Sequence, residues 1–181
     1  MMEDITMEDK TFEVYLSEVE LKAIVSELAA KLNEEYGQYQ LEVILISILD
    51  GSFIFMADLV RQLTFPHKIQ FVKLSSYEDM ESRGEVEFVL DLRTEVDGKH
   101  VVVIEDIIDT GLTIESFIAK LEARNPLSVK ICTLLSKPDV HNDIVDIHFL
   151  GKEIPPEFVV GYGLDLNGYG RNLPHIYKLK V

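Results

Sequence analysis

One short segment of the chain combines acidic, hydroxyl and glycine residues in an order suited to binding a phosphorylated sugar. It reads Glu105-Asp106-Ile107-Ile108-Asp109-Thr110-Gly111-Leu112-Thr113 and follows the apolar run 101–104. From Asp109 onward, successive backbone N–H groups and two hydroxyls precede an expected helix, and helix N-termini of this kind bind phosphate. Glu105 and Asp106 offer carboxylate oxygens to sugar hydroxyls or to a divalent cation. The segment therefore predicts a site for a phosphorylated sugar and a metal ion.

Each of these residues, taken singly, also has an ordinary structural explanation. Two acids can simply end a strand, and Asp109 can cap a helix. The complete string after a buried strand is poorly explained in this way. Other phosphate motifs fail: the chain has no G-x-x-x-x-G-K-[ST] loop, and Leu166 stands where a dinucleotide fingerprint beginning at Gly161 needs its third glycine.

The elements around this segment are expected to alternate between strands and helices. Ser17 begins an S-x-x-E capping box, and the apolar spacing after it predicts a helix over 18–33. Further helices are expected over 53–63 and 112–123, strands over 41–49, 69–74, 86–92, 99–104 and 128–135, and short strand-like pieces over 147–150, 158–164 and 176–180. This order predicts an α/β fold with a mostly parallel twisted sheet flanked by helices.

Composition limits the class of protein. The 181 residues are 47% hydrophobic, which favours one domain with a buried core. With 17 Lys+Arg against 32 Asp+Glu, the net charge of −15 argues against binding nucleic acid phosphates. The single cysteine, Cys132, excludes an intramolecular disulfide. Residues 1–10 do not resemble a secretion signal and 43–49 is too short to cross a bilayer, so a cytoplasmic protein is expected.

The segment 105–113 resembles the phosphoribosyl-pyrophosphate signature of the type I phosphoribosyltransferases, in the form seen in their hypoxanthine/guanine branch. Four other stretches match in order and approximate spacing: Leu49-Asp50-Gly51-Ser52-Phe53, Ser75-Ser76-Tyr77, Ser136-Lys137-Pro138 and 158–165. The resemblance covers most of the chain. It implies a single phosphoribosyltransferase domain over 1–181, with a small hood formed from the chain ends and the C-terminal part of that hood at about 151–181.

The resemblance also implies an activity. Such enzymes act in purine salvage and transfer 5-phosphoribosyl from phosphoribosyl pyrophosphate to hypoxanthine or guanine, giving IMP or GMP and pyrophosphate with Mg²⁺. Asp109 would act at the purine N7, as general base or as acceptor for its proton. Residues Glu105, Asp106, Ile107, Ile108, Asp109, Thr110, Gly111, Leu112 and Thr113 would bind the phosphoribosyl group, and Glu105 and Asp106 would hold ribose hydroxyls or approach the metal.

The base pocket follows from the same resemblance. Lys137 would recognise the purine O6, because an ammonium only donates and suits a carbonyl oxygen better than the amino group of adenine. Phe158 would stack on the purine, and the backbone near Val159 would read its Watson–Crick edge. Asp165, at the end of this purine-binding stretch, would bind a second Mg²⁺.

The pyrophosphate loop would contain Asp50 and Gly51, with Arg171 as a further contact. The peptide bond before Asp50 can be cis in the family. The sequence departs from the family at Asp50, where a Lys or Arg is common, and at Leu112, which replaces a lysine of some relatives. Ser76 and Tyr77 match a mobile lid over about 75–85, although a simple hairpin tip is the other interpretation.

Two alternatives remain for the function. A phosphoribosyl-pyrophosphate-binding regulator of the same fold would be expected to show a basic face or an added DNA-binding segment, and neither is evident. A transferase for another base, such as xanthine, would share the phosphate site. No nucleic acid or membrane partner is expected, and the family implies a homodimer or homotetramer.

Overall fold

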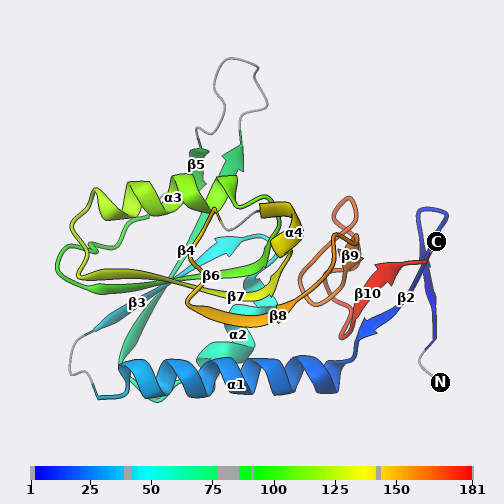
Figure 1. Cartoon of the computed structure of the whole chain (residues 1–181), viewed down its shortest axis with the longest axis horizontal. Coiled ribbons are helices and arrows are strands. Elements are labelled where there is room, and N and C mark those ends of the chain that lie inside the picture. Colours follow the sequence, from blue (N-terminus) through cyan, green and yellow to red (C-terminus); the bar gives the residue numbers. More distant parts are fainter. Residues whose placement is uncertain (1–2, 39–41, 77–85, 91, 142–143, 181) are drawn as a thin grey trace.

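The main sheet of the molecule has six strands, five of them parallel. The computed structural model describes residues 3–38, 42–76, 86–90, 92–141 and 144–180. Strands β3 (Val43–Leu49), β4 (His67–Ser76), β6 (His100–Ile108), β7 (Ser128–Ser136) and β8 (Phe149–Glu153) are parallel, and β5 (Val86–Leu90) is antiparallel to β4. Their order is β5-β4-β3-β6-β7-β8 (Figure 1).

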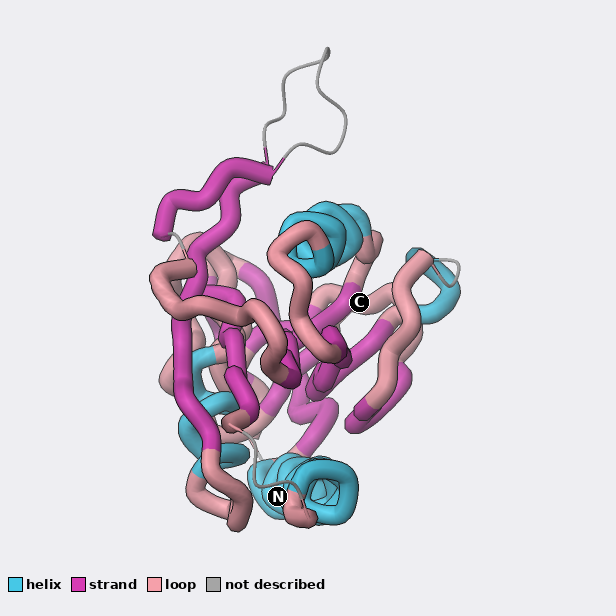
Figure 2. Tube along the Cα trace, turned by 90° about the vertical axis from the view of Figure 1, so that its left-hand side faces the viewer, coloured by secondary structure: helices cyan, strands magenta, loops and turns pink. Residues whose placement is uncertain are grey.

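Helices cover both faces of this sheet. The helices α1 (Glu18–Tyr36) and α2 (Phe53–Val60) lie on one side and α3 (Leu112–Glu122) on the other, which Figure 2 shows in end view. The alternation of β6 explains the two cores: Val102 and Ile104 pack on the α1 side, whereas Val101 and Val103 pack on the α3 side. The predicted α/β layering is confirmed.

Helix α1 begins where its capping box predicts. The backbone N–H of Glu20 donates to Ser17 Oγ at 3.3 Å, and the backbone N–H of Ser17 donates to Glu20 Oε2 at 2.8 Å. The helix runs three residues beyond the predicted end, because the buried Tyr36 extends its apolar face.

A second, antiparallel sheet is built from segments near the two chain ends. Its order is β1 (Ile5–Met7), β2 (Lys10–Leu16), β10 (Ile176–Leu179) and β9 (Val159–Val160), and its own small core includes Phe12 and Tyr177. This sheet, with the loops from β9 to β10, is called the hood below. It confirms the expected hood, although the sequence patterns had not indicated the strands over 5–16.

Several predicted elements differ in extent from the observed ones: α2 ends at Val60 rather than at 63, β4 is longer than predicted at both ends, and three other strands differ as follows. The strand expected over 158–164 is only two residues long, because Gly161, Tyr162 and Gly163 have positive φ values of 99°, 51° and 104°. The strand expected over 99–104 continues to Ile108, since its pairing with β7 continues to Ser136. The piece expected over 147–150 begins later, at Phe149.

Two further expectations concern the polar stretch and the membrane. Ser76 is the last residue of β4, whereas Tyr77 and the rest of the predicted lid lie outside the described residues. None of the described helices is both long and apolar enough to cross a bilayer.

Candidate active site

Lys137 and Asp109 meet at the carboxyl ends of two neighbouring strands. Ile108 of β6 is in register with Ser136 of β7, and the Lys137 backbone N–H donates to the Ile108 carbonyl at 2.9 Å. The residues that follow this pair are therefore neighbours, and Lys137 Nζ lies 2.7 Å from Asp109 Oδ2. The Lys137 side chain is 10% exposed and that of Asp109 is 50% exposed. A buried ammonium is thus held beside a carboxylate that faces solvent.

The segment after β6 forms one wall of a cavity of about 240 Å³. Gly111 has φ 78°, and α3 begins with the next residue, so the loop turns sharply into a helix N-terminus. The polar lining consists of Glu105, Asp109, Thr110, Gly111 and Thr113. The apolar lining consists of Ile48, Leu49, Leu74, Ile107, Ile108 and Ile114. Leu112 is absent from the lining and half-exposed.

Glu105 faces this cavity with an unsatisfied oxygen. Its Oε2 is buried and has no hydrogen-bond partner among the described residues. Burial raises the pKa of Glu105 well above its usual range, and the nearby charge of Asp106 raises it further. A carboxyl group of this kind has unused capacity for a ligand hydroxyl or a cation.

Asp106 lies on the opposite side of β6 from Glu105, as strand alternation requires. It is buried, and a Cβ placed on Gly51 would collide with its carboxylate. Burial raises the pKa of Asp106 to about 6, although backbone hydrogen bonds and Arg171 oppose the shift and Asp165 adds to it. Gly51 is thus required at this position by the close approach of the carboxylate.

The loop that carries Asp165 rests on the loop 49–52. A Cβ on Gly163 would collide with the Gly51 carbonyl, and Arg171 Nη1 donates to the Gly163 carbonyl at 2.7 Å. Arg171 Nη2 also lies 2.8 Å from Asp165 Oδ1. The structure therefore brings Asp106, Asp165, Arg171 and Gly51 together in one corner, beside the cavity that Glu105 lines.

This corner fits a magnesium ion that arrives with a phosphorylated ligand. No group of three or more His, Cys, Asp or Glu side chains arranged to hold a metal occurs in the part of the chain that the structure describes. Mg²⁺ commonly uses one or two carboxylates together with water and phosphate oxygens. The buried Asp106, packed against the Gly51 backbone, and the neighbouring Asp165 supply such a donor set.

Asp50 has a partner that the sequence patterns did not indicate. The peptide bond between Leu49 and Asp50 is cis. Lys73 of β4 lies beside this loop, with Nζ 2.5 Å from Asp50 Oδ2. Strand register explains the contact, because Lys73 is opposite Leu49 of β3. The only sequence hint was a lysine two residues before Ser75-Ser76, which is unremarkable without the pairing.

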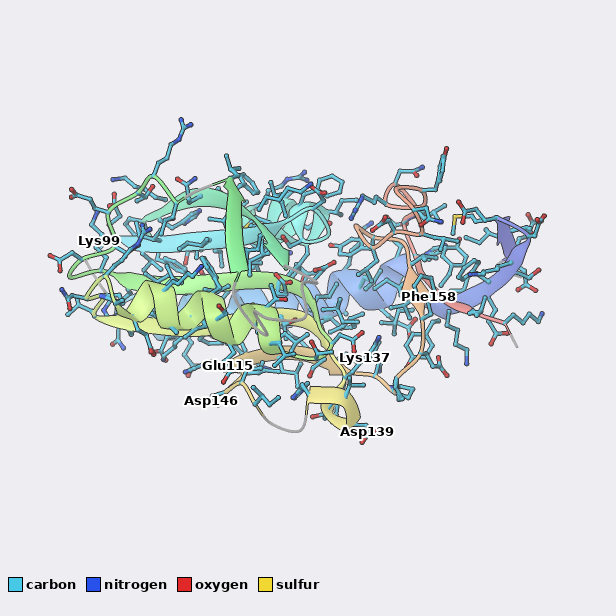
Figure 3. All side chains as sticks on the ribbon, turned by 90° about the horizontal axis from the view of Figure 1, so that it is seen from above. Lys99, Glu115, Lys137, Asp139, Asp146 and Phe158 are labelled. Atoms are coloured by element: carbon cyan, nitrogen blue, oxygen red, sulfur yellow. The ribbon has the colours of Figure 1, made fainter. Side chains whose placement is uncertain are left out.

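The aromatic and backbone groups of the expected base pocket lie in the hood. Phe158 is half-exposed, and its ring centroid lies 6.3 Å from that of Phe12. Val159 is buried and pairs with Lys178 of β10. Figure 3 shows Lys137 at the end of the main sheet nearest the hood and Phe158 in the hood, whereas Lys99 marks the far end of the sheet.

A hydrogen bond that sequence reasoning missed joins the hood to helix α2. The Tyr162 hydroxyl donates to Asp58 Oδ2 of α2 at 2.8 Å, and the Tyr162 side chain is buried. The pair joins the loop before Asp165 to the helix that follows the loop 49–52. No local sequence signal links two residues so far apart in the chain.

Comparison with known proteins adds independent findings. The model of the phosphoribosyl transferase domain matches residues 14–167. A hypoxanthine phosphoribosyltransferase of Buchnera aphidicola is 42% identical over 170 residues, covering 93% of this chain and 96% of the relative. A hypoxanthine-guanine phosphoribosyltransferase of Staphylococcus aureus is 41% identical over 169 residues and 93% of each chain. The crystal structure of a hypoxanthine-guanine phosphoribosyltransferase from Bacillus anthracis matches with TM-score 0.87 and 37% identity, covering 93% of this chain and 98% of that one.

Proposed function

This chain belongs to the phosphoribosyltransferase family, in its hypoxanthine(-guanine) branch, and we propose on that basis how its site performs the reaction. It is a hypoxanthine(-guanine) phosphoribosyltransferase of purine salvage, whose substrates are phosphoribosyl pyrophosphate and a 6-oxopurine. The proposal concerns the residues that bind each substrate, the metal and the preferred bases.

The Lys137–Asp109 pair is the observation that carries the assignment of the base site. A 6-oxopurine presents O6 and N7 side by side on one edge. Lys137 donates to O6, and Asp109, at 2.7 Å from the ammonium, accepts the proton at N7. Adenine has an amino group in place of O6. That amino group and the Lys137 ammonium are both hydrogen-bond donors, so neither finds an acceptor in the other. The pair therefore favours 6-oxopurines over adenine.

The cavity beside the start of α3 takes the 5′-phosphate and the ribose. Backbone N–H groups of 109–113 and the hydroxyls of Thr110 and Thr113 bind the phosphate at the helix N-terminus. Glu105 accepts hydrogen bonds from the ribose hydroxyls, which gives its buried oxygen the partners it lacks. These contacts hold the sugar so that its reacting carbon faces the base.

The corner formed by Asp106, Asp165, Arg171 and Gly51 takes the diphosphate. Arg171 binds phosphate oxygens with its planar fork, and the Gly51 backbone permits close approach. Asp106 and Asp165 would hold Mg²⁺. When bound, the ion would neutralise charge on the departing pyrophosphate. Asp165 also stabilises the loop 165–168, because its Oδ2 accepts a hydrogen bond from the Gly168 N–H at 2.6 Å.

Self-association is a separate part of the proposal. Ile69 and Phe71 lie on one face of β4 and are exposed, and Leu90 of the neighbouring β5 is exposed as well. An apolar strip of this kind favours a homodimer or homotetramer. Light scattering coupled to size-exclusion chromatography tests this, and a single monomer mass at micromolar concentration would contradict it.

The reaction is tested by measuring Mg²⁺-dependent nucleotide formation from phosphoribosyl pyrophosphate with hypoxanthine, guanine, xanthine and adenine in parallel. We expect turnover with hypoxanthine and guanine and little with adenine. Turnover with xanthine above both would reassign the base preference. Binding of phosphoribosyl pyrophosphate without turnover of any base would instead support a regulator of the same fold.

A further inference from the structure

Lys73 is a cation at the edge of the site that none of the roles above uses. Its Cα is in register with Leu49, the residue before Asp50. Its Nζ lies 2.5 Å from Asp50 Oδ2, and both side chains are a little under half-exposed. A carboxylate of the loop 49–52 therefore holds this ammonium against the loop itself.

The loop 49–52 lies between two cations. Gly51 directly follows Asp50, the partner of Lys73, and its carbonyl faces Gly163. Arg171 donates to the carbonyl of that same Gly163 at 2.7 Å. An anion that contacts the backbone of Gly51 is consequently approached by Arg171 from the hood and by Lys73 from β4.

The described side chains around the site carry more negative than positive charge, and a bound diphosphate adds further negative charge. Among the residues that the structure describes, the carboxylates of the site are Asp50, Glu105, Asp106, Asp109 and Asp165, and its cations are Lys73, Lys137 and Arg171. Lys137 is paired with Asp109 and serves the base. A highly charged diphosphate next to several carboxylates needs every remaining cation within reach.

Building on the proposed function, we propose that Lys73 binds the diphosphate of phosphoribosyl pyrophosphate and the pyrophosphate product, and that Asp50 is the positioning residue that orients it. An ammonium has three N–H donors, so Lys73 keeps its bond to Asp50 and still offers donors to phosphate oxygens. Asp50 thus contributes through Lys73, although its own charge is unfavourable next to a phosphate.

The test is the affinity of the complete protein for pyrophosphate with Mg²⁺, measured by titration calorimetry. Lys73→Met should weaken binding about tenfold, the effect of losing one partly screened, charge-assisted hydrogen bond. The KM for phosphoribosyl pyrophosphate should rise similarly, while the KM for hypoxanthine stays within twofold. The salt dependence of pyrophosphate binding should also become shallower, which a purely structural role would not produce.

Lys68 supplies a matched control. It lies near the opposite end of the same strand and is paired with a carboxylate in the same way, with Nζ 2.9 Å from Glu42 Oε2. Lys68→Met should leave pyrophosphate affinity unchanged. Lys73→Arg should retain the affinity, and Asp50→Lys in the Lys73→Met background should restore most of it by placing an ammonium on the loop.

The outcomes separate this proposal from the proposed function. Wild-type turnover together with unchanged pyrophosphate affinity in a folded Lys73→Met would overturn the role of Lys73 alone. An equal loss of pyrophosphate affinity in Lys68→Met would also overturn it. So would a protein carrying both Asp50→Lys and Lys73→Met that melts like wild type but recovers no pyrophosphate affinity. A wild-type protein that neither binds pyrophosphate nor turns over a base would overturn the proposed function itself.

Discussion

Replacing Lys137 with methionine separates recognition of the base from stability of the fold. Methionine keeps much of the volume of the buried side chain and removes the ammonium. Asp109 then loses its partner, but its side chain is 50% exposed and water can solvate the carboxylate. Breaking a buried ion pair is costly mainly when the remaining charge is buried, whereas here the ammonium that is removed is the 10% exposed member and the remaining carboxylate is half-exposed. We therefore expect the free energy of unfolding to change by less than about 1 kcal/mol.

The expected loss in catalysis is much larger. A hydrogen bond from a charged donor to the purine O6 contributes about 1.5–3 kcal/mol. At about 1.4 kcal/mol per factor of ten, kcat/KM for hypoxanthine should fall roughly 10- to 150-fold. The value for adenine should stay constant or rise, because the variant no longer places an ammonium against its amino group. Discrimination between the two bases should therefore fall by at least the same factor.

The assay is steady-state kinetics with hypoxanthine and adenine at saturating phosphoribosyl pyrophosphate, together with thermal unfolding. A Lys137→Met protein that melts within a few degrees of wild type and keeps the wild-type hypoxanthine-to-adenine ratio would refute the assignment of Lys137 to O6. A large drop in melting temperature would refute the argument that Asp109 tolerates the loss of its partner.

Three other variants test different parts of the structure. Asp109→Asn removes the proton acceptor and leaves the buried Lys137 ammonium without a carboxylate, so kcat should fall roughly 100- to 10,000-fold and the protein should lose about 1–3 kcal/mol of stability. Asp106→Asn tests the pKa of Asp106, which burial raises to about 6. Because the unfolded chain releases this proton near pH 4, ionisation makes the folded state less stable as pH rises from about 4 to 6, by about 3 kcal/mol in total. In EDTA the variant should melt above wild type at pH 8, with the difference vanishing near pH 4. Ser17→Ala removes the cap of α1 and should lower stability by about 1 kcal/mol, or about 2–4 °C, with kcat unchanged.

Matched controls and contrary results define these tests. Asp139, an exposed acid on the short helix α4 (Pro138–His141), is the control for Asp109, and Asp139→Asn should keep wild-type kcat. Equal single-turnover rates for wild type and Asp109→Asn would remove Asp109 as proton acceptor. If the difference in melting temperature between Asp106→Asn and wild type were the same at every pH, the raised pKa of Asp106 would be contradicted. Ser26, exposed in the middle of α1, is the control for Ser17, and equal effects of the two substitutions would contradict the capping argument.

Local sequence patterns were sufficient to predict most of the main sheet and its long helices, although not strands β1 and β2 of the hood. The capping box at Ser17, the apolar run of β3 and the spacing of α3 each follow from neighbouring residues. The end of β6 could not be predicted in this way, because Glu105 and Asp106 are polar and disfavour a strand locally. They are held in one because β6 continues to pair with β7 as far as Ser136.

The sequence motifs identified most residues of the candidate site, but they did not predict how these residues contact one another. Asp109 and Lys137 stand out in sequence, yet their 2.7 Å contact depends on the register of two strands. Lys73 carries no motif, and only its position opposite Leu49 brings it to Asp50. Which residues assemble around a ligand thus depends on tertiary pairings that a single sequence does not encode locally.

The pairing of β2 with β10 has a consequence for how the protein is made. The ribosome releases β2 before every strand of the main sheet and its partner β10 after all of them. The main sheet and its phosphate cavity can therefore assemble first. Until β10 is made, one edge of β2 is unpaired and can form incorrect strand pairings. A nascent chain stalled before Ile176 would hold the sugar-binding half of the site without a completed hood. Translation of β10 is thus required before the hood can be completed beside the main sheet.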